Sequence, residues 1–213
     1  MTSQAALLGS SVHDAAQRAA DLLAVLLPRT GHRLPPGRAD ERAAVIEVLR
    51  AHGEPEPVEI SAAGLNDLRR AALELREVFT ATDVATAADR INDLLAGRAH
   101  PPRLTTHSGS SGWHLHVDSS DDAPWGEWFL TSSCLALAVL LAERQAPPAG
   151  ICASPSCLRP FVNVGRGAAR RYCSAPLRHP RAGRRVPRGR SCGPAVKGLA
   201  AWNTSTWAGL ACP

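Results

Sequence analysis

Three cysteines in the C-terminal third of the chain have the residue type and spacing of metal ligands. Cys152 and Cys157 are separated by four residues on a proline-containing turn, and Cys173 follows after a glycine-rich return. Structural zinc sites take four donors in a tetrahedron, and close cysteine pairs on turns supply two of them at a time. The three cysteines therefore predict three ligands of a zinc site. No general base is placed beside them by the sequence, so we expect no catalysis there.

The fourth ligand of this site has two candidates. His179 comes six residues after Cys173, whereas Cys192 lies beyond a proline- and glycine-rich run and would cost more loop entropy. We therefore predict His179 as the fourth ligand and keep Cys192 as the alternative. Cys134 lies in an apolar run and is interpreted as a small core residue.

Charge is divided unevenly along the chain. The formal net charge is +5, but residues 151–213 hold 11 Lys or Arg and no Asp or Glu, which leaves 13 basic and 19 acidic residues in 1–150. An acidic body with a basic arm is typical of proteins that bind nucleic acid or another polyanion. Arginine forks suit phosphate oxygens, so we predict phosphate contacts for the four arginines of the cysteine segment, Arg159, Arg166, Arg170 and Arg171. A solvated basic tail is the alternative interpretation.

The front of the chain has the periodicity of a helical domain. Apolar residues at helical spacing predict helices over 12–27, 41–51, 61–79, 83–97 and 124–144. Ser61 and Asp83 are of the types that cap the third and fourth helices. The fifth is apolar nearly all round, which predicts a central buried helix.

Between the fourth and fifth helices the apolar period changes to alternation. Residues 103–107 and 113–118, joined by a Ser/Gly turn, predict a β-hairpin at about 103–118. We expect the apolar side chains of the second strand to face the helices, namely Trp113, Leu115 and Val117. The alternating polar side chains are of metal-binding types, but one segment supplies them all, so we interpret them as a solvated strand face: His114, His116 and Asp118.

Together these patterns predict a mainly α fold with one β-hairpin (α+β), then a small zinc-knuckle-like module and a disordered basic tail. The predicted boundaries are a helical domain at 1–146, a linker at 147–150, the cysteine module at 151–175 and the tail at 176–213. The start of the chain lacks the features of a signal peptide, and its most apolar run is shorter than the roughly 18 residues of a membrane span. We expect a cytoplasmic protein without membrane contact, where metal explains a cysteine pair better than a disulfide.

Several of these motifs are similar to those of one bacterial family. They are Cys152-x4-Cys157, Phe161, Asn163 near a usual acidic position, Arg170-Arg171-Tyr172-Cys173-Ser174, and the hairpin Trp113-His-Leu-His-Val117 followed by the Trp125/Trp128 helix. The cysteine module resembles a CGNR-type zinc finger, and the front domain resembles the ABATE domain that precedes it in bacterial proteins described as stress-induced transcription regulators. The resemblance covers most of residues 12–175. It implies zinc as cofactor and DNA as partner, with a front domain that senses a small-molecule or protein signal or mediates assembly.

The chain departs from this family after Ser174. The family continues with a fourth cysteine in a Cys-Gly-Asn-Arg or Cys-Ala-x-Arg run that opens a basic helix, whereas this chain has Ala175-Pro-Leu-Arg-His-Pro. Written in GC-rich codons and read one base later, residues 176–187 become Arg-Cys-Ala-Thr-Arg-Val-Arg-Ala-Ala-Ala-Tyr. We therefore hypothesise that the chain past about Ala175 is a frame-shifted tail, so that the finger is incomplete and the function of this copy impaired.

Two other classes of function stay open at the level of sequence. The first is a protein–protein interaction module in which zinc is only a structural staple. The second is an enzyme that uses a cleft of the front domain near Trp113 and Trp125. No nucleophile elbow, Ser/His/Asp set or carboxylate pair is indicated by spacing, so we expect the protein not to be an enzyme.

Overall fold

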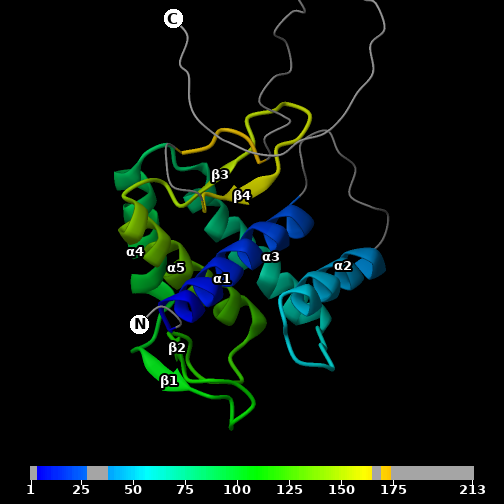
Figure 1. The fold of residues 1–213 in the computed structure, drawn as a ribbon. Helices are drawn as coiled ribbons and strands as arrows, with labels where there is room; N and C mark the ends of the chain where they lie inside the picture. The colour runs from blue at the N-terminus through cyan, green and yellow to red at the C-terminus, as the bar shows by residue number, and fades with distance from the viewer. Residues whose placement is uncertain (1–3, 28–37, 165–168, 174–213) are drawn as a thin grey trace, which may run out of the picture. The chain divides into compact units, whose positions relative to one another are not determined.

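The computed structural model describes residues 4–27, 38–164 and 169–173 (Figure 1). In that part of the chain the elements are, in order, α1 (Gln4–Leu26), α2 (Arg38–Ala51), α3 (Ala62–Thr80), α4 (Val84–Arg98), β1 (Arg103–Thr105), β2 (His114–His116), α5 (Trp125–Arg144), β3 (Ala149–Ile151) and β4 (Pro160–Val162). The predicted mainly α, α+β class is confirmed, and a second antiparallel strand pair accompanies the predicted hairpin. The predicted disordered tail lies outside the described residues.

The fifth helix, α5, is central to the helical core, as predicted. It packs against α1, α3 and α4 (Figure 1), and its buried side chains include Phe129, Leu130, Leu137 and Leu140. Gly126 allows a close approach to α3, because a Cβ there would lie 2.8 Å from the carbonyl oxygen of Asp67.

Length and composition alone would allow α5 to cross a membrane, and among the described residues it is the single helix that meets both conditions. Half of its apolar window is buried against the rest of the protein. Central helices of soluble domains have the same properties, so this helix is weak evidence of a membrane span.

Side-chain caps fix the starts of α3 and α4 as predicted. The Ser61 hydroxyl accepts the N–H of Gly64 at 3.0 Å, and the Asp83 carboxylate accepts the N–H of Thr86 at 2.8 Å. These bonds satisfy donors that the first helical turn leaves unpaired. The predicted apolar stripe of α3 is buried throughout: Leu65, Leu68, Ala72, Leu75 and Phe79.

The hairpin is formed by β1 and β2, but its faces are reversed relative to the prediction. Trp113 and Leu115 are 74% and 46% exposed, so the expectation that they face the helices is wrong; Val117 is buried, as expected. The side chains of His116 and Asp118 are only 9% and 2% exposed. The interpretation of these polar residues as a solvated face is therefore wrong as well.

An ion-pair network explains the reversal. The register places Arg103 opposite His116, and in an antiparallel pair opposite residues share a face. The Arg103 guanidinium donates to Asp118 at 2.6 Å and to Asp121 at 2.5 Å. A buried carboxylate requires such a partner, and the pairing holds the polar face inward against the simple preference for burying apolar residues.

The second strand pair, β3 and β4, carries the cysteine segment. The antiparallel register is Ala149 with Val162, Gly150 with Phe161 and Ile151 with Pro160. β3 contacts α3 and β4 contacts α1, so the strands are docked on the helical core. Two residues of the predicted linker, Ala149 and Gly150, belong to β3. A Cβ on Gly150 would lie 2.9 Å from the Phe161 ring, which explains why glycine suits this position.

Candidate metal centre

The thiols of Cys152, Cys157 and Cys173 converge beside the β3–β4 pair. Their sulfur atoms all lie within 4.8 Å of one another, and those of Cys157 and Cys173 are 3.6 Å apart. Cys152 is buried, while the other two are half-buried. A disulfide would require about 2.05 Å between two sulfurs, whereas three thiols at these separations can bind one metal ion.

A tight turn between β3 and β4 positions the first two cysteines. The N–H of Cys152 donates to the carbonyl of Arg159 at 2.9 Å, and the N–H of Cys157 donates to the carbonyl of Ser154 at 2.9 Å. Leu158 then adopts a φ of +47°, in the left-handed region. This conformation turns the chain back into β4, so the four-residue spacing brings both thiols to one side.

The third cysteine is held by the returning chain at residues 169–173. The N–H of Arg170 donates to the Asn163 side-chain oxygen at 3.2 Å, and the N–H of Ala153 donates to the carbonyl of Arg171 at 2.8 Å. These bonds place Cys173 against the turn.

Asn163 joins this segment to the end of α5. Its side chain is buried, and its amide group donates to the Pro147 carbonyl at 2.9 Å while accepting from Arg170. Its backbone N–H donates to the Pro148 carbonyl, and its own carbonyl accepts from Arg144 at 2.5 Å. An amide can donate and accept at once, which a carboxylate at this position could not do.

The thiols influence one another's ionisation. Burial opposes ionisation of Cys152, but the backbone N–H groups of Cys173 and Ser154 and the neighbouring thiols outweigh it and lower the pKa of Cys152. Burial, together with the thiols of Cys157 and Cys152, raises the pKa of Cys173 to about 11. One thiolate is therefore favoured and a second is resisted, since like charges at this distance repel. A bound cation would remove that repulsion, so the donor set fits a metal ion.

The predicted fourth ligands, His179 and Cys192, lie outside the described residues. Within the part of the chain that the structure describes, the cysteine cluster contains three donors. Cys134, by contrast, is fully buried in α5, and burial raises its pKa to about 12, as expected of a core residue.

The arginines predicted to contact phosphate differ in their surroundings. Arg159 donates to Asp21 of α1 at 3.1 Å. Arg170 donates to the Val162 carbonyl at 2.5 Å, and its guanidinium lies over the Phe161 ring. Arg171 is exposed, and Arg166 lies outside the described residues. Their contact with phosphate stays a prediction.

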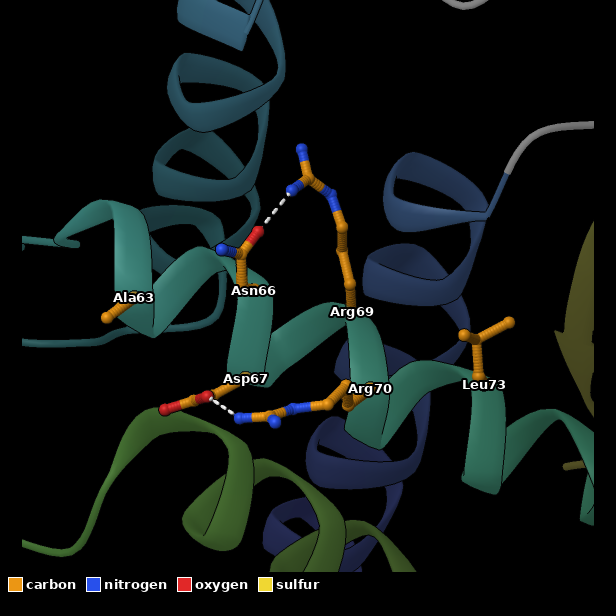
Figure 2. Close-up of a pocket in the computed structure, with 6 residues that line it drawn as sticks. All are labelled: Ala63, Asn66, Asp67, Arg69, Arg70 and Leu73. Carbon is orange, nitrogen blue, oxygen red and sulfur yellow. Dashed lines mark hydrogen bonds and ion pairs between the residues drawn. The ribbon is translucent and has the colours of Figure 1, made fainter.

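Two open surface pockets are relevant to the alternative that the protein is an enzyme. One, of about 460 Å³, lies on the outer face of α3 and is lined by Ala63, Asn66, Asp67, Arg69, Arg70 and Leu73 (Figure 2). Its two arginines are paired, Arg69 with Asn66 and Glu41, and Arg70 with Asp67. The other, of about 370 Å³, lies beside α1 and α2 and includes Arg159. Neither pocket is lined by Trp113 or Trp125.

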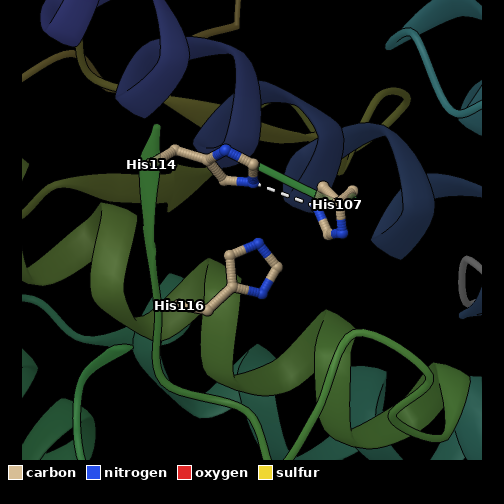
Figure 3. Close-up of side chains that lie close together, drawn as sticks. All are labelled: His107, His114 and His116. Carbon is tan, nitrogen blue, oxygen red and sulfur yellow. Dashed lines mark hydrogen bonds between the residues drawn. The ribbon is translucent and has the colours of Figure 1, made fainter. Parts of the chain in front are cut away.

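A second group of metal-type donors was missed by sequence reasoning. Side-chain nitrogens of His107, His114 and His116 lie within 4.8 Å of one another (Figure 3). The sequence interpretation grouped His114 and His116 with Asp118, because all three are on one segment, and did not include His107. The pairing of 103–107 with 113–118 was the available signal, since a hairpin returns His107 to the same end.

Comparison with known proteins returned no matching family model and no matching curated protein. The fold and the site define a mainly α-helical protein with two small strand pairs and a cluster of three cysteines that could hold a metal ion. The resemblance to the ABATE domain and the CGNR finger rests on the motifs quoted above and stays a prediction.

Proposed function

We propose that the protein is a zinc-dependent DNA-binding transcription regulator, in which the cysteine module binds zinc and DNA and the helical domain senses a signal or mediates assembly. The observation that carries this proposal is the convergence of three thiols within 4.8 Å on a segment rich in arginine. The absence of any acidic residue from 151–213 supports a polyanionic partner.

The donor type supports zinc in particular. Soft thiolate ligands select zinc, copper(I) and iron–sulfur clusters over magnesium or calcium. Zinc accepts three cysteines with one further donor in a tetrahedron, the arrangement of a structural site. His179 is proposed as that donor and Cys192 as the alternative. Zinc would lock the turn at Cys157 to the return at Cys173, and in small modules such binding contributes about 10–16 kcal/mol.

Arg171 offers the clearest test of DNA binding, because it is exposed and adjoins Cys173 through one residue. The full chain, loaded with zinc, is titrated with duplex DNA over a range of salt concentrations. Each phosphate contact contributes a log–log slope of about −0.9, so Arg171→Ala should reduce the slope by roughly that amount. Arg98→Ala, on the exposed face of α4, is the matched control and should leave the slope unchanged. DNA binding that is absent, or equally affected by both variants, would contradict the proposal.

A second candidate function is favoured by the contacts of two arginines. Arg159 is bonded to Asp21, and Arg170 is bonded to the Val162 carbonyl. Both guanidinium groups therefore stabilise the module and its junction with α1. This arrangement suits a zinc staple in a protein–protein interaction module. In that case removing zinc would lower the melting temperature of the full chain, and the zinc-loaded protein would not bind DNA even at low salt.

A further inference from the structure

The inward face of the hairpin brings three imidazoles together from two chain segments (Figure 3). The Nε2 atoms of His107 and His114 are 3.0 Å apart. The ring centroids of the three histidines are separated by 4.8 Å, 4.8 Å and 5.0 Å. His107 reaches this position because it and Ser108 have φ values of +48° and +58°, which turn the chain sharply after β1. Left-handed backbone at non-glycine residues is costly and concentrates at functional sites.

The Nδ1 atom of each histidine lies near an oxygen acceptor. His114 Nδ1 is 2.7 Å from the carbonyl oxygen of Gly112, and His116 Nδ1 is 2.9 Å from the Asp118 carboxylate. His107 Nδ1 is 3.5 Å from the Asp121 carboxylate. Because a carbonyl or a carboxylate can only accept, these contacts favour the tautomer with the proton on Nδ1, which leaves a lone pair on Nε2.

The two carboxylates are themselves held in place. Arg103 donates to Asp118 at 2.6 Å and to Asp121 at 2.5 Å, and the Thr105 hydroxyl donates to Asp121 at 2.8 Å. Histidines that ligate metals almost always donate their other N–H to a carboxylate or carbonyl in this way. The hairpin therefore contains both the donors and the groups that orient them.

The Nε2 atoms of His107 and His114, which face each other across the cluster, are close enough to share one cation. If both Nε2 atoms carry a lone pair, His107 and His114 repel each other across the 3.0 Å that separates these atoms, and a cation bound between them removes the repulsion. In a tetrahedral zinc site with Zn–N bonds of about 2.0–2.1 Å, neighbouring nitrogens are separated by little more than 3 Å.

We propose that His107, His114 and His116 form a second metal site, which binds a first-row divalent cation such as zinc through three imidazole nitrogens. Neutral imidazole suits zinc, copper, iron and nickel, and three histidines leave one coordination position open for water or an exogenous ligand. The charged groups beside the histidines are the Asp118 and Asp121 carboxylates and the Arg103 guanidinium that pairs with both of them. This site shares no residue with the cysteine centre.

The experiment isolates this site in the full chain by replacing Cys152, Cys157 and Cys173 with serine. After chelator treatment, this variant is titrated with zinc chloride and followed by calorimetry. We expect about one equivalent of zinc to bind. Adding His114→Gln should weaken binding, and adding Asp118→Asn should weaken it about 10- to 100-fold, because the orienting carboxylate is lost. His100→Gln, a half-exposed loop histidine outside the cluster, is the matched control and should bind as its parent does.

Two further measurements decide the outcome, and the first of them uses the unmodified chain, so it does not depend on the folding of any variant. In the unmodified chain, nitrogen NMR should show the Nε2 signals of all three histidines shifting on addition of zinc, with Nδ1 still protonated. Cobalt(II) bound by the Cys-to-Ser chain should lack the intense sulfur-to-metal absorption that thiolates give. Zinc binding weaker than about 100 µM, unshifted histidine signals, or equal losses for His114→Gln and His100→Gln would overturn the proposal.

Discussion

The Arg18 guanidinium lies over the indole of Trp128, with its central carbon 4.1 Å from the ring centroid. The same group donates to Glu54 and to the Ser132 hydroxyl, each at 3.2 Å. It therefore ties α1 to α5 and to the segment after α2. Its side chain is 12% exposed, and burial lowers the pKa of Arg18, so these partners are what keep the cation there.

Replacing Arg18 with alanine should destabilise the protein by about 2–4 kcal/mol, because Glu54 would keep a largely buried charge without its partner. Arg70→Ala is the control: that arginine is 75% exposed, and surface pairs contribute about 0–1 kcal/mol. The measurement is urea unfolding of the full chain. Equal losses from the two variants would contradict the interpretation of Arg18 as a buried link.

Gly126→Ala should separate α3 from α5. The added Cβ would meet the backbone oxygen and carbonyl carbon of Asp67 at 2.8 and 2.9 Å, and backbone atoms cannot rotate away. Overpacking of this kind costs about 1–3 kcal/mol. Gly97→Ala in α4 meets nothing within 4 Å and should stabilise by about 0.5–1 kcal/mol, since alanine is the better helix former. If the melting temperature falls in Gly126→Ala and rises in Gly97→Ala, the close approach of α3 and α5 is supported. Changes of the same sign in the two variants would contradict it.

Asn163→Ala should weaken both the fold and metal binding at the cysteines. The change removes the partners of the Arg170 N–H and the Pro147 carbonyl, and an unsatisfied buried polar group costs about 1–3 kcal/mol. Because Arg170 leads to Cys173, zinc affinity should fall as well. Asn66→Ala, at an exposed position of α3, serves as control and should alter neither the melting temperature nor zinc affinity. Unchanged zinc affinity in Asn163→Ala would show that Cys173 is positioned by other contacts.

Cys134 should resist alkylation in the native protein. Burial raises its pKa to about 12, so at neutral pH the group is a thiol, and only the thiolate reacts. Mass spectrometry after iodoacetamide treatment should show Cys134 modified only in denaturant. Its ionised fraction should rise about tenfold per pH unit until the pH reaches its pKa. Metal should protect Cys157 and Cys173 and leave Cys134 unaffected; native labelling of Cys134 at the rate of Cys157 would contradict its burial.

The helices could be predicted from sequence because local signals and packing agree. Ser61 has both the residue type and the following apolar spacing of a cap, and α3 begins at the next residue. The β3–β4 pair was missed, since each strand has three residues. Three residues are too few for alternation to be read, and Pro160 weakens the strand signal further.

The buried face of the hairpin was predicted wrongly. Alternation of apolar and polar residues shows that the two sets lie on opposite faces, but not which face is turned toward the helices. Leu115 alternates with His114 and His116 in either orientation. The inward face was decided by Arg103, thirteen residues before His116, through its pairing with Asp118. Such a pairing depends on strand register, which the turn sets and which the apolar pattern here does not encode.

The cysteine cluster was accessible from spacing, since Cys152 and Cys157 lie on one turn. The histidine cluster was harder to predict, because it depends on the pairing of two strands and His107 joins it through a left-handed turn after β1. Its backbone conformation has no sequence signal as strong as a glycine. Residues from both strands had to be placed before the three rings could be seen as one group.

Each end of α5 is bonded to a segment that carries one donor cluster. Glu127 accepts the N–H of Ser119, just beyond β2, and Arg144 donates to the carbonyl of Asn163 beside the cysteines. A helix of this length measures about 30 Å and is stiff along its axis. If metal binding in one cluster displaced α5, it would therefore change the metal affinity of the other cluster. Thermodynamic linkage requires this change in binding free energy to be equal in both directions.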